Sequence, residues 1–346
     1  MRRAVAAGVV VALLGGLGAG CALRPEPAPA ETELSLSGDI HTHDPALVAG
    51  AEGEPWFVFS TGDVREGLGA PQIRRSDDGG LTWEMVGTVW DAKTRPTWVY
   101  EAVPGVSNFW APDVIENDGT FYLYYSASTF GSNRSVIGLT TNTTLDPDDP
   151  DYAWVDQGEV IRSEPGVTNY NAIDPGIVED ADGTPWMAFG SFWGGIQLVE
   201  LEWPSGKPVD GAEPTTIASR TSPPNAIEAP YLVLRDGWYY LFVSRDSCCK
   251  GSDSTYNIAV GRSQEVTGPY VDRDGKDMTL DGAEQLLTST GDMIGPGGQS
   301  VSNGYLAFHY YDAAAGGDFR LDIRELAWDD DGWPVATTRE EQEAQS

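Results

Sequence analysis

Three carboxylates that stand beside prolines could perform glycoside hydrolysis. Asp44 and Asp174 each directly precede a proline, and Glu228 stands two residues before one. The reaction needs one carboxylic acid to protonate the leaving oxygen and one carboxylate to activate water or attack the sugar. Apolar residues flank Glu228 on both sides, so burial should raise its pKa, which predicts Glu228 as the general acid and Asp44 as the general base.

A structural interpretation of the same pattern stays open. Acidic residues before prolines often cap turns, and a chain with 53 acidic residues is expected to contain several by chance. Asp113 illustrates this, because it follows its proline while Ala111 occupies the aligned position before it. We therefore interpret Asp113 as structural.

A repeated turn and strand indicate which elements position these carboxylates. Five times, a turn that ends in glycine is followed by an aromatic-rich run of strand length, which is typical of a β-hairpin. The runs are Trp56 to Ser60, Phe121 to Tyr125, Trp186 to Phe189, Trp238 to Val243 and Tyr305 to His309. Each unit has room for about four short strands, and five such units predict an all-β fold, a five-bladed β-propeller.

A proline also marks the chain ahead of each aromatic strand. The marked positions are Asp44-Pro45, Pro112-Asp113, Asp174-Pro175, Glu228-Ala229-Pro230 and Gly295-Pro296. Proline is tolerated at the first residue of a strand, so we expect these residues to open the innermost strand of each blade. Side chains from different blades would then converge near the central axis.

Six ordered segments resemble the arabinanases of glycoside hydrolase family 43, over the chain from about Gly38 to Pro334. The segments are His43-Asp44-Pro45, Trp110 to Val114, Asn171 to Pro175, Ser191 to Ile196, Ile227 to Tyr231, and Cys248-Cys249. The resemblance implies an inverting mechanism on α-1,5-linked L-arabinofuranose. It also implies that Asp44 is the general base, Glu228 the general acid, and Asp174 a third carboxylate that orients the acid and tunes its pKa.

The same resemblance implies where the sugar binds. The expected substrate contacts are Trp110, Asn171, Ser191, Phe192 and Trp193. Aromatic faces suit the apolar side of a furanose, although packing within a blade explains Phe192 or Trp193 nearly as well. Inversion requires a water between base and sugar, so Asp44 and Glu228 should lie roughly 6.5 to 9.5 Å apart.

One departure from the family concerns a metal. Many arabinanases that this chain resembles have a histidine after Gly-Pro-Gly that holds an axial metal, commonly calcium, whereas Gly298 follows that motif here. We expect no required cofactor, keep calcium at the propeller axis as an open possibility, and assign no metal ligands. His309 is interpreted as a buried core histidine, while His41 and His43 stay ambiguous.

Composition limits the partners. A formal charge of −32 would repel nucleic acid and anionic membranes, so we expect a neutral polysaccharide, arabinan or arabino-oligosaccharides, as the partner of a monomer. Cys248 and Cys249 are adjacent, which suits neither a long-loop staple nor a zinc site. They could form a vicinal disulfide or pack as buried thiols. An Asp-box-like segment, Ser76 to Trp83, is interpreted as structural.

The ends of the chain indicate export. Residues 1–21 resemble a signal peptide, because Arg2 and Arg3 precede an apolar run that is too short to span a bilayer. Cys21 follows a lipobox-like segment, so a lipid anchor there is the one expected membrane contact, with plain cleavage as the alternative. Residues 22–38 are predicted to be a linker, 39–334 the catalytic propeller, and 335–346 a polar acidic tail. The protein should be extracellular, either secreted or tethered to the cell envelope.

Three functions remain compatible with these features. Endo-acting cleavage of arabinan is the expected activity. An exo-acting α-L-arabinofuranosidase or β-xylosidase could use the same scaffold, because loops at the ends of the cleft decide between the two modes. A non-catalytic surface propeller that binds carbohydrate is the alternative from another class. A sialidase is disfavoured, since few arginines occur in the inner segments to bind a carboxylate.

Overall fold

The computed structural model describes residues 36–336, which are built almost entirely from β-strands. The predicted signal peptide, with Cys21, and nearly all of the predicted linker and acidic tail lie outside the described residues. Within those residues, helix is limited to short turns. They are α1 (Val99–Ala102), η1 (Gly67–Gly69), η2 (Gly251–Asp253), η3 (Met278–Leu280) and η4 (Ala313–Ala315). No helix in this part of the chain is long and apolar enough to cross a membrane.

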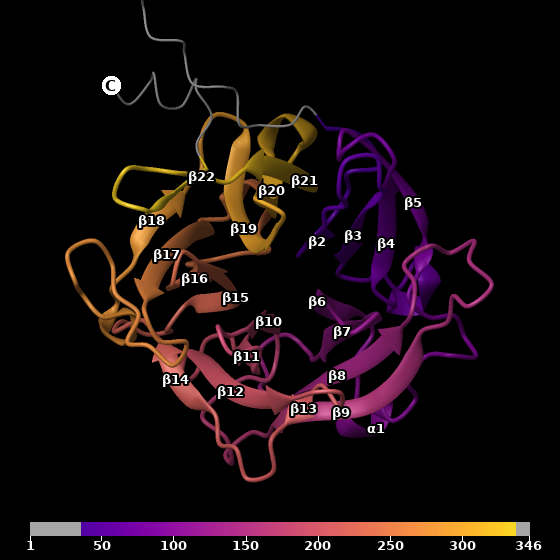
Figure 1. Ribbon diagram of the computed structural model, residues 1–346, viewed down its shortest axis with the longest axis horizontal. Coiled ribbons are helices and arrows are strands. Elements are labelled where there is room, and N and C mark those ends of the chain that lie inside the picture. Colours follow the sequence, from indigo (N-terminus) through magenta and orange to yellow (C-terminus); the bar gives the residue numbers. More distant parts are fainter. Residues whose placement is uncertain (1–35, 337–346) are drawn as a thin grey trace, which may run out of the picture. The chain divides into compact units, whose positions relative to one another are not determined.

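Five β-sheet blades surround a central axis in the order of the sequence (Figure 1). Blade 1 contains β1 (Ser37–Gly38), β2 (Ala46–Val48), β3 (Trp56–Ser60), β4 (Gln72–Ser76) and β5 (Thr82–Thr88). Blade 2 contains β6 (Phe109–Asn117), β7 (Thr120–Ala127), β8 (Ser135–Asn142) and β9 (Val155–Ser163). Blade 3 contains β10 (Gly176–Glu179), β11 (Pro185–Phe189), β12 (Ile196–Glu202), β13 (Lys207–Pro208) and β14 (Thr215–Ala218).

The last two blades complete the circle. Blade 4 contains β15 (Ile227–Arg235), β16 (Trp238–Arg245), β17 (Asn257–Ser263) and β18 (Glu284–Leu287). Blade 5 contains β19 (Met293–Ser302), β20 (Tyr305–Asp312) and β21 (Asp318–Glu325), and a separate pair joins β22 (Ala327–Trp328) to β23 (Pro334–Val335). The predicted all-β, five-bladed propeller is confirmed. The expected four strands per blade are not uniform, since blades 1 and 3 have five and blade 5 has three.

The N-terminal segment supplies the fifth strand of blade 1, β1, and helps to close the ring. The innermost strand β19 contacts β2, so the last blade meets the first. The Ile40 carbonyl accepts a hydrogen bond at 2.8 Å from the Leu321 N–H on β21, while Ser37 and Gly38 pair with β5. Residues 37–38 therefore belong to the propeller and not to the predicted linker. Ala336 is likewise buried, so the propeller extends two residues beyond the predicted boundary at 334.

The prolines mark the innermost strands, as expected, but do not always open them. In blades 1 and 3 the strand starts directly after the proline. In blades 2, 4 and 5 the strand starts earlier, and the proline lies at a shift in register between the first and second strands. A bulge of this kind leaves a residue unpaired, so the missing N–H of proline breaks no ladder bond.

The residue before each of these prolines has a left-handed backbone. Its φ is 52° at Asp44, 39° at Ala111, 57° at Asp174, 49° at Ala229 and 58° at Gly295. Such angles are uncommon for residues other than glycine and cluster at functional sites. The same kink therefore recurs at the inner edge of all five blades.

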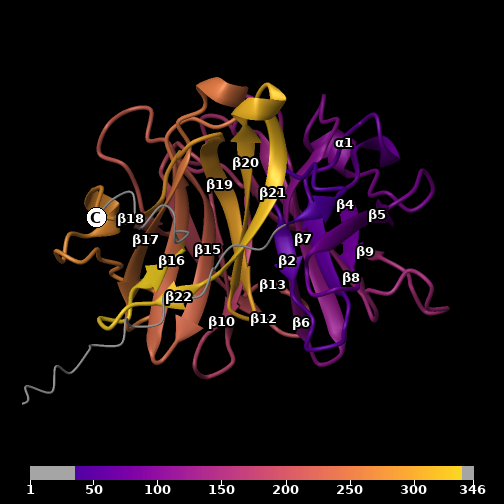
Figure 2. The same cartoon turned by 90° about the horizontal axis from the view of Figure 1, so that it is seen from above.

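Aromatic side chains fill the space between strands. Trp90, Phe109 and Tyr125 are buried and meet edge to face, with ring centroids 4.7 to 5.5 Å apart, the geometry that aromatic pairs prefer. In the Asp-box-like segment, Asp78 accepts hydrogen bonds from the N–H groups of Leu81 and Thr82. The structure supports the structural interpretation of that segment, because the hydrogen bonds of Asp78 stay within the hairpin. Figure 2 shows the strands of blade 5 standing upright, with α1 and the helical turn beside β20 at the same end.

Candidate active site

A cleft of about 1580 Å³ is lined by residues from all five blades. The residues predicted from the sequence all line it: Asp44, Trp110, Asn171, Asp174, Ser191, Phe192, Trp193 and Glu228. The repeated kink explains how adjacent residues can share this cleft. In a regular strand consecutive side chains point to opposite faces, whereas both His43 and Asp44 line the cleft.

Asp44 is held as an anion by its neighbours. Its Oδ2 accepts hydrogen bonds from Thr61 Oγ1 at 2.6 Å and from His43 Nδ1 at 2.8 Å. Burial alone would raise the pKa of Asp44, but the contacts with His43, His309 and Thr61 outweigh it and hold that pKa well below its usual range. The lowered pKa favours the ionised form of Asp44.

Glu228 has the opposite tendency. Burial raises its pKa, and the negative charge of Asp44 raises it further, while a hydrogen bond from Ser191 Oγ to Oε2 at 2.7 Å opposes the shift. Tyr256 also lowers the pKa of Glu228, by a smaller effect than Ser191. The cleft thus contains one carboxyl group kept ionised and another that tends to retain its proton, which is the division that acid and base catalysis need.

Asp174 shares with Glu228 the tendency to retain a proton. Burial, then the charge of Glu228, then the charge of Asp44, raise the pKa of Asp174 well above its usual value. The Ala229 N–H donates to Asp174 Oδ2 at 3.1 Å and lowers the pKa, but by less. Because Ala229 directly follows Glu228, this bond also ties Asp174 to the backbone that carries the acid. Asp174 and Glu228 therefore titrate as a pair.

The predicted substrate contacts fall into two groups. Trp193 is 38% exposed, and Trp110 packs against Phe130 with ring centroids 5.0 Å apart, so aromatic surface is available to a ligand. Asn171 and Ser191 are buried, and their side chains already bond to the protein: Ser135 Oγ donates to Asn171 Oδ1 at 2.6 Å, and Ser191 bonds to Glu228. These two polar residues therefore hold neighbouring side chains in place, namely those of Ser135 and Glu228.

Sequence reasoning missed several residues of the cleft. Thr61, directly after β3, and Tyr311, on β20, carried no signal, because a lone hydroxyl has no distinctive spacing. Phe130 is 83% exposed beside Gly131, and an aromatic residue in a polar loop is a signal that could have been used. His43, left ambiguous by the sequence, contacts Asp44 directly. Asp113 lies on a separate axial cavity of about 30 Å³ and not on the cleft.

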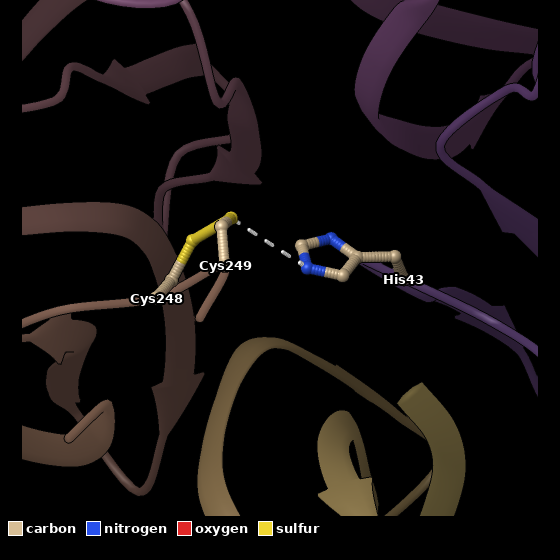
Figure 3. Close-up of side chains that lie close together, drawn as sticks. All are labelled: His43, Cys248 and Cys249. Carbon is tan, nitrogen blue, oxygen red and sulfur yellow. Dashed lines mark hydrogen bonds between the residues drawn. A yellow bond between two sulfur atoms is a disulfide. The ribbon is translucent and has the colours of Figure 1, made fainter. Parts of the chain in front are cut away.

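Cys248 and Cys249 form a vicinal disulfide that faces the cleft (Figure 3). The alternative of buried thiols is wrong, since Cys249 is exposed and its Sγ lies 4.0 Å from His43 Nε2. These three side chains are close enough together to share an ion. As long as both sulfurs are joined in a disulfide, they offer no thiolate to a metal.

The residues near the axis do not suit a directly coordinated calcium ion. His43, Asp44 and His309 come close together, but the Nδ1 atom of each histidine is already used. His309 is completely buried and its Nδ1 accepts a hydrogen bond from the Asp44 N–H at 3.1 Å, so its Nε2 carries the proton and cannot bind a cation. A Cβ on Gly298 would lie 2.5 Å from Asp44 Oδ1 and 2.8 Å from His309 Nδ1, so a side chain at this position would require these groups to shift.

A five-bladed propeller whose axial cleft contains carboxyl groups of opposed pKa defines a glycoside hydrolase. The family model described as "Glycosyl hydrolases family 43" matches residues 66–334. The chain belongs to this family, and the resemblance inferred from the six sequence segments is confirmed.

Relatives with assigned activities are similar over most of their length. An extracellular endo-α-(1→5)-L-arabinanase 1 of Bacillus subtilis is 42% identical over 310 residues, which cover 89% of this chain and 91% of the relative. An extracellular exo-α-(1→5)-L-arabinofuranosidase of Cellvibrio japonicus is 39% identical over 315 residues, which cover 87% and 88%. A solved endo-arabinanase of Bacillus licheniformis has a TM-score of 0.80 at 42% identity and covers 87% of this chain and 99% of its own.

Proposed function

We propose that this protein is an inverting hydrolase that cleaves α-1,5-linked L-arabinofuranosyl bonds within arabinan chains. The observation that carries the proposal is the opposed pKa shift of Asp44 and Glu228 in one cleft. An ionised base and a protonated acid at the same pH are what the inverting reaction requires.

The hydrogen bonds suggest which oxygen atoms react. His43 and Thr61 both bond to Oδ2 of Asp44, so Oδ1 is left to take the proton of the attacking water. Ser191 bonds to Oε2 of Glu228, so Oε1 is left to protonate the leaving oxygen. A water must fit between the base and the sugar, for which the two carboxyl groups should stand roughly 6.5 to 9.5 Å apart.

Asp174 serves the acid in this proposal. Burial and the charge of Glu228 raise the pKa of Asp174, so Asp174 tends to hold a proton, and its bond to the Ala229 N–H fixes it beside the backbone of the acid. When Glu228 gives its proton to the leaving oxygen, the proton on Asp174 remains for the pair to share, which limits the build-up of like charge. We therefore assign Asp174 to orienting and tuning Glu228.

Three observations support a polysaccharide substrate and cleavage within the chain. The cleft volume of about 1580 Å³ exceeds the ~300 to 1,000 Å³ typical of sites for small molecules. Trp110, Phe130 and Trp193 supply aromatic surface along it. The Bacillus relatives described above are named as endo-acting enzymes.

Exo action is the second candidate, and one observation favours it: the Cellvibrio relative of almost equal similarity is named an exo-acting arabinofuranosidase. Time-resolved chromatography of the products from debranched arabinan separates the two. Short mixed oligomers early in the reaction support endo action, whereas arabinose or one fixed small product throughout means exo action. No product at all, with binding retained, would mean a carbohydrate-binding protein.

We further propose that the protein is exported and works as a monomer, anchored through a lipid on Cys21. The charged and apolar leader predicts export, and both curated relatives are named extracellular.

A further inference from the structure

A chain of hydrogen bonds leads from the disulfide to the proposed base. The Cys249 N–H donates to Tyr311 Oη at 2.8 Å, Tyr311 Oη lies 2.9 Å from His43 Nε2, and His43 Nδ1 lies 2.8 Å from Asp44 Oδ2. Cys249 follows the second strand of blade 4, Tyr311 lies on β20 of blade 5, and His43 precedes β2 of blade 1. This series of hydrogen bonds therefore spans three blades.

The donors and acceptors in this chain fix where the protons lie. An ionised carboxylate can only accept, so His43 Nδ1 must carry a hydrogen. The backbone N–H of Cys249 can only donate, so Tyr311 Oη accepts from it and has its own proton to give to His43 Nε2. Burial raises the pKa of Tyr311, which keeps that proton on the phenol. A neutral His43 with hydrogen on Nδ1 satisfies every bond.

Packing leaves the ring of His43 little freedom. Its face stacks on His309 with centroids 3.6 Å apart, and Phe319 meets it edge to face at 5.2 Å. These contacts fix the plane of the ring but do not distinguish one nitrogen from the other. The hydrogen bonds at the two nitrogens do so, because Asp44 accepts from Nδ1 and Tyr311 donates to Nε2.

The vicinal disulfide holds in place the turn at Cys249, where this series of hydrogen bonds begins. Cys249 has a left-handed φ of 64°, and the bond to Cys248 restrains that turn beside His43 (Figure 3). Lys250 N–H donates to Ser254 Oγ just after the turn. The Cys249 N–H is thereby directed at Tyr311.

We propose that Tyr311 is a positioning residue that fixes His43 in the tautomer with hydrogen on Nδ1, so that His43 holds Oδ2 of Asp44 and leaves Oδ1 for the attacking water. The catalytic part of this inference rests on the proposed function of Asp44. The assignment of the His43 tautomer does not rest on that function, so the tautomer assignment and the proposed function can fail separately.

The variant Tyr311→Phe tests the proposal, because it keeps the ring and removes only the hydroxyl. We expect kcat on arabinan to fall about tenfold, the loss expected for one hydrogen bond of about 1.4 kcal/mol, with KM changed less than about twofold. Tyr124→Phe is the matched control, because it removes a buried hydroxyl that donates at 2.8 Å to the Gly206 carbonyl, away from the cleft. Tyr124→Phe should retain kcat.

The tautomer can be measured directly, since the chain contains three histidines. Long-range ¹H–¹⁵N correlation spectra of histidine-labelled protein should show hydrogen on Nδ1 of His43 in the parent and in Tyr124→Phe, and a gain of the Nε2–H form in Tyr311→Phe. A parent His43 protonated on Nε2 or on both nitrogens would overturn the proposal, as would a Tyr311→Phe variant with the parent tautomer and kcat. If the tautomer is as expected but Asp44→Ala retains full activity, the proposed function fails and the positioning of His43 stands.

Discussion

Ser191 Oγ donates a 2.7 Å hydrogen bond to Oε2 of Glu228, and this bond lowers the pKa that burial raises. Removing the hydroxyl in Ser191→Ala should therefore raise the pKa of Glu228 and keep the acid protonated to higher pH. We expect the basic limb of the kcat/KM profile on arabinan to move to higher pH.

Ser76→Ala is the matched control for this change. Ser76 Oγ also donates at 2.7 Å to a carboxylate, that of Asp78, in the hairpin of blade 1. The pH profile of Ser76→Ala should match that of the parent. A basic limb that stays in place in Ser191→Ala would mean that Glu228 is not the group titrating there.

The proposed acid and base can be removed one at a time. Asp44→Ala and Glu228→Gln should each lower turnover by at least about a hundredfold, because general acid or base catalysis typically contributes 10²–10⁴-fold. Circular dichroism and thermal melting should confirm that both variants fold. Glu84→Gln removes an exposed carboxylate from β5 and should keep full activity. Either active-site variant working as fast as the parent would exclude that residue from the mechanism.

Asp113 should make the protein less stable as the pH rises. Burial raises its pKa to about 7 from an unfolded value of 3.8, so the folded state favours the protonated acid. This stabilisation is complete below pH 3.8 and is lost as the pH rises to about 7. Asp113→Asn stays neutral, so its unfolding free energy relative to the parent should increase by up to about 4 kcal/mol between pH 4 and pH 8. Urea unfolding at both pH values measures this, and a constant difference would contradict it.

Chelation should affect this enzyme less than an arabinanase that has a histidine after Gly-Pro-Gly. Gly298 occupies that position here, and the lone pair of His309 Nδ1 is already bonded to the Asp44 N–H. After dialysis against a strong chelator we expect arabinan hydrolysis to persist. Complete loss of activity that calcium restores would show that an ion is essential and is held by other groups.

Cys21 should determine where the mature protein is found. The parent is expected in the cell-envelope fraction, and Cys21→Ala in the medium, because the mutation removes the acylation site. Immunoblots of fractionated cultures measure both. A parent protein found wholly in the medium would exclude the lipid anchor.

The sequence by itself predicted the architecture, which is confirmed, and singled out three carboxylates, all of which line the cleft. Glycines mark the five turns, the aromatic runs that follow mark the strand next to the innermost one in every blade, and the prolines mark the innermost strand. The glycines are Gly53, Gly119, Gly183, Gly237 and Gly304. These are local features: turn geometry, strand propensity and the missing N–H of proline act over a few residues, so they can be read without a fold. They could not indicate that Ser37 and Ala336 belong to the propeller, because those contacts depend on partners elsewhere in the chain.

Only the tertiary structure decided what surrounds the carboxylates. His43 and Tyr311 are 268 residues apart and still share a hydrogen bond, because closure of the ring brings blade 5 against blade 1. Ser191 reaches Glu228 from the neighbouring blade in the same way. Burial and hydrogen bonds from distant residues set the pKa of each acid, and neither is encoded in local spacing. Local sequence features therefore identified the candidate acids, while the packing of the blades sets the direction in which the pKa of each one shifts.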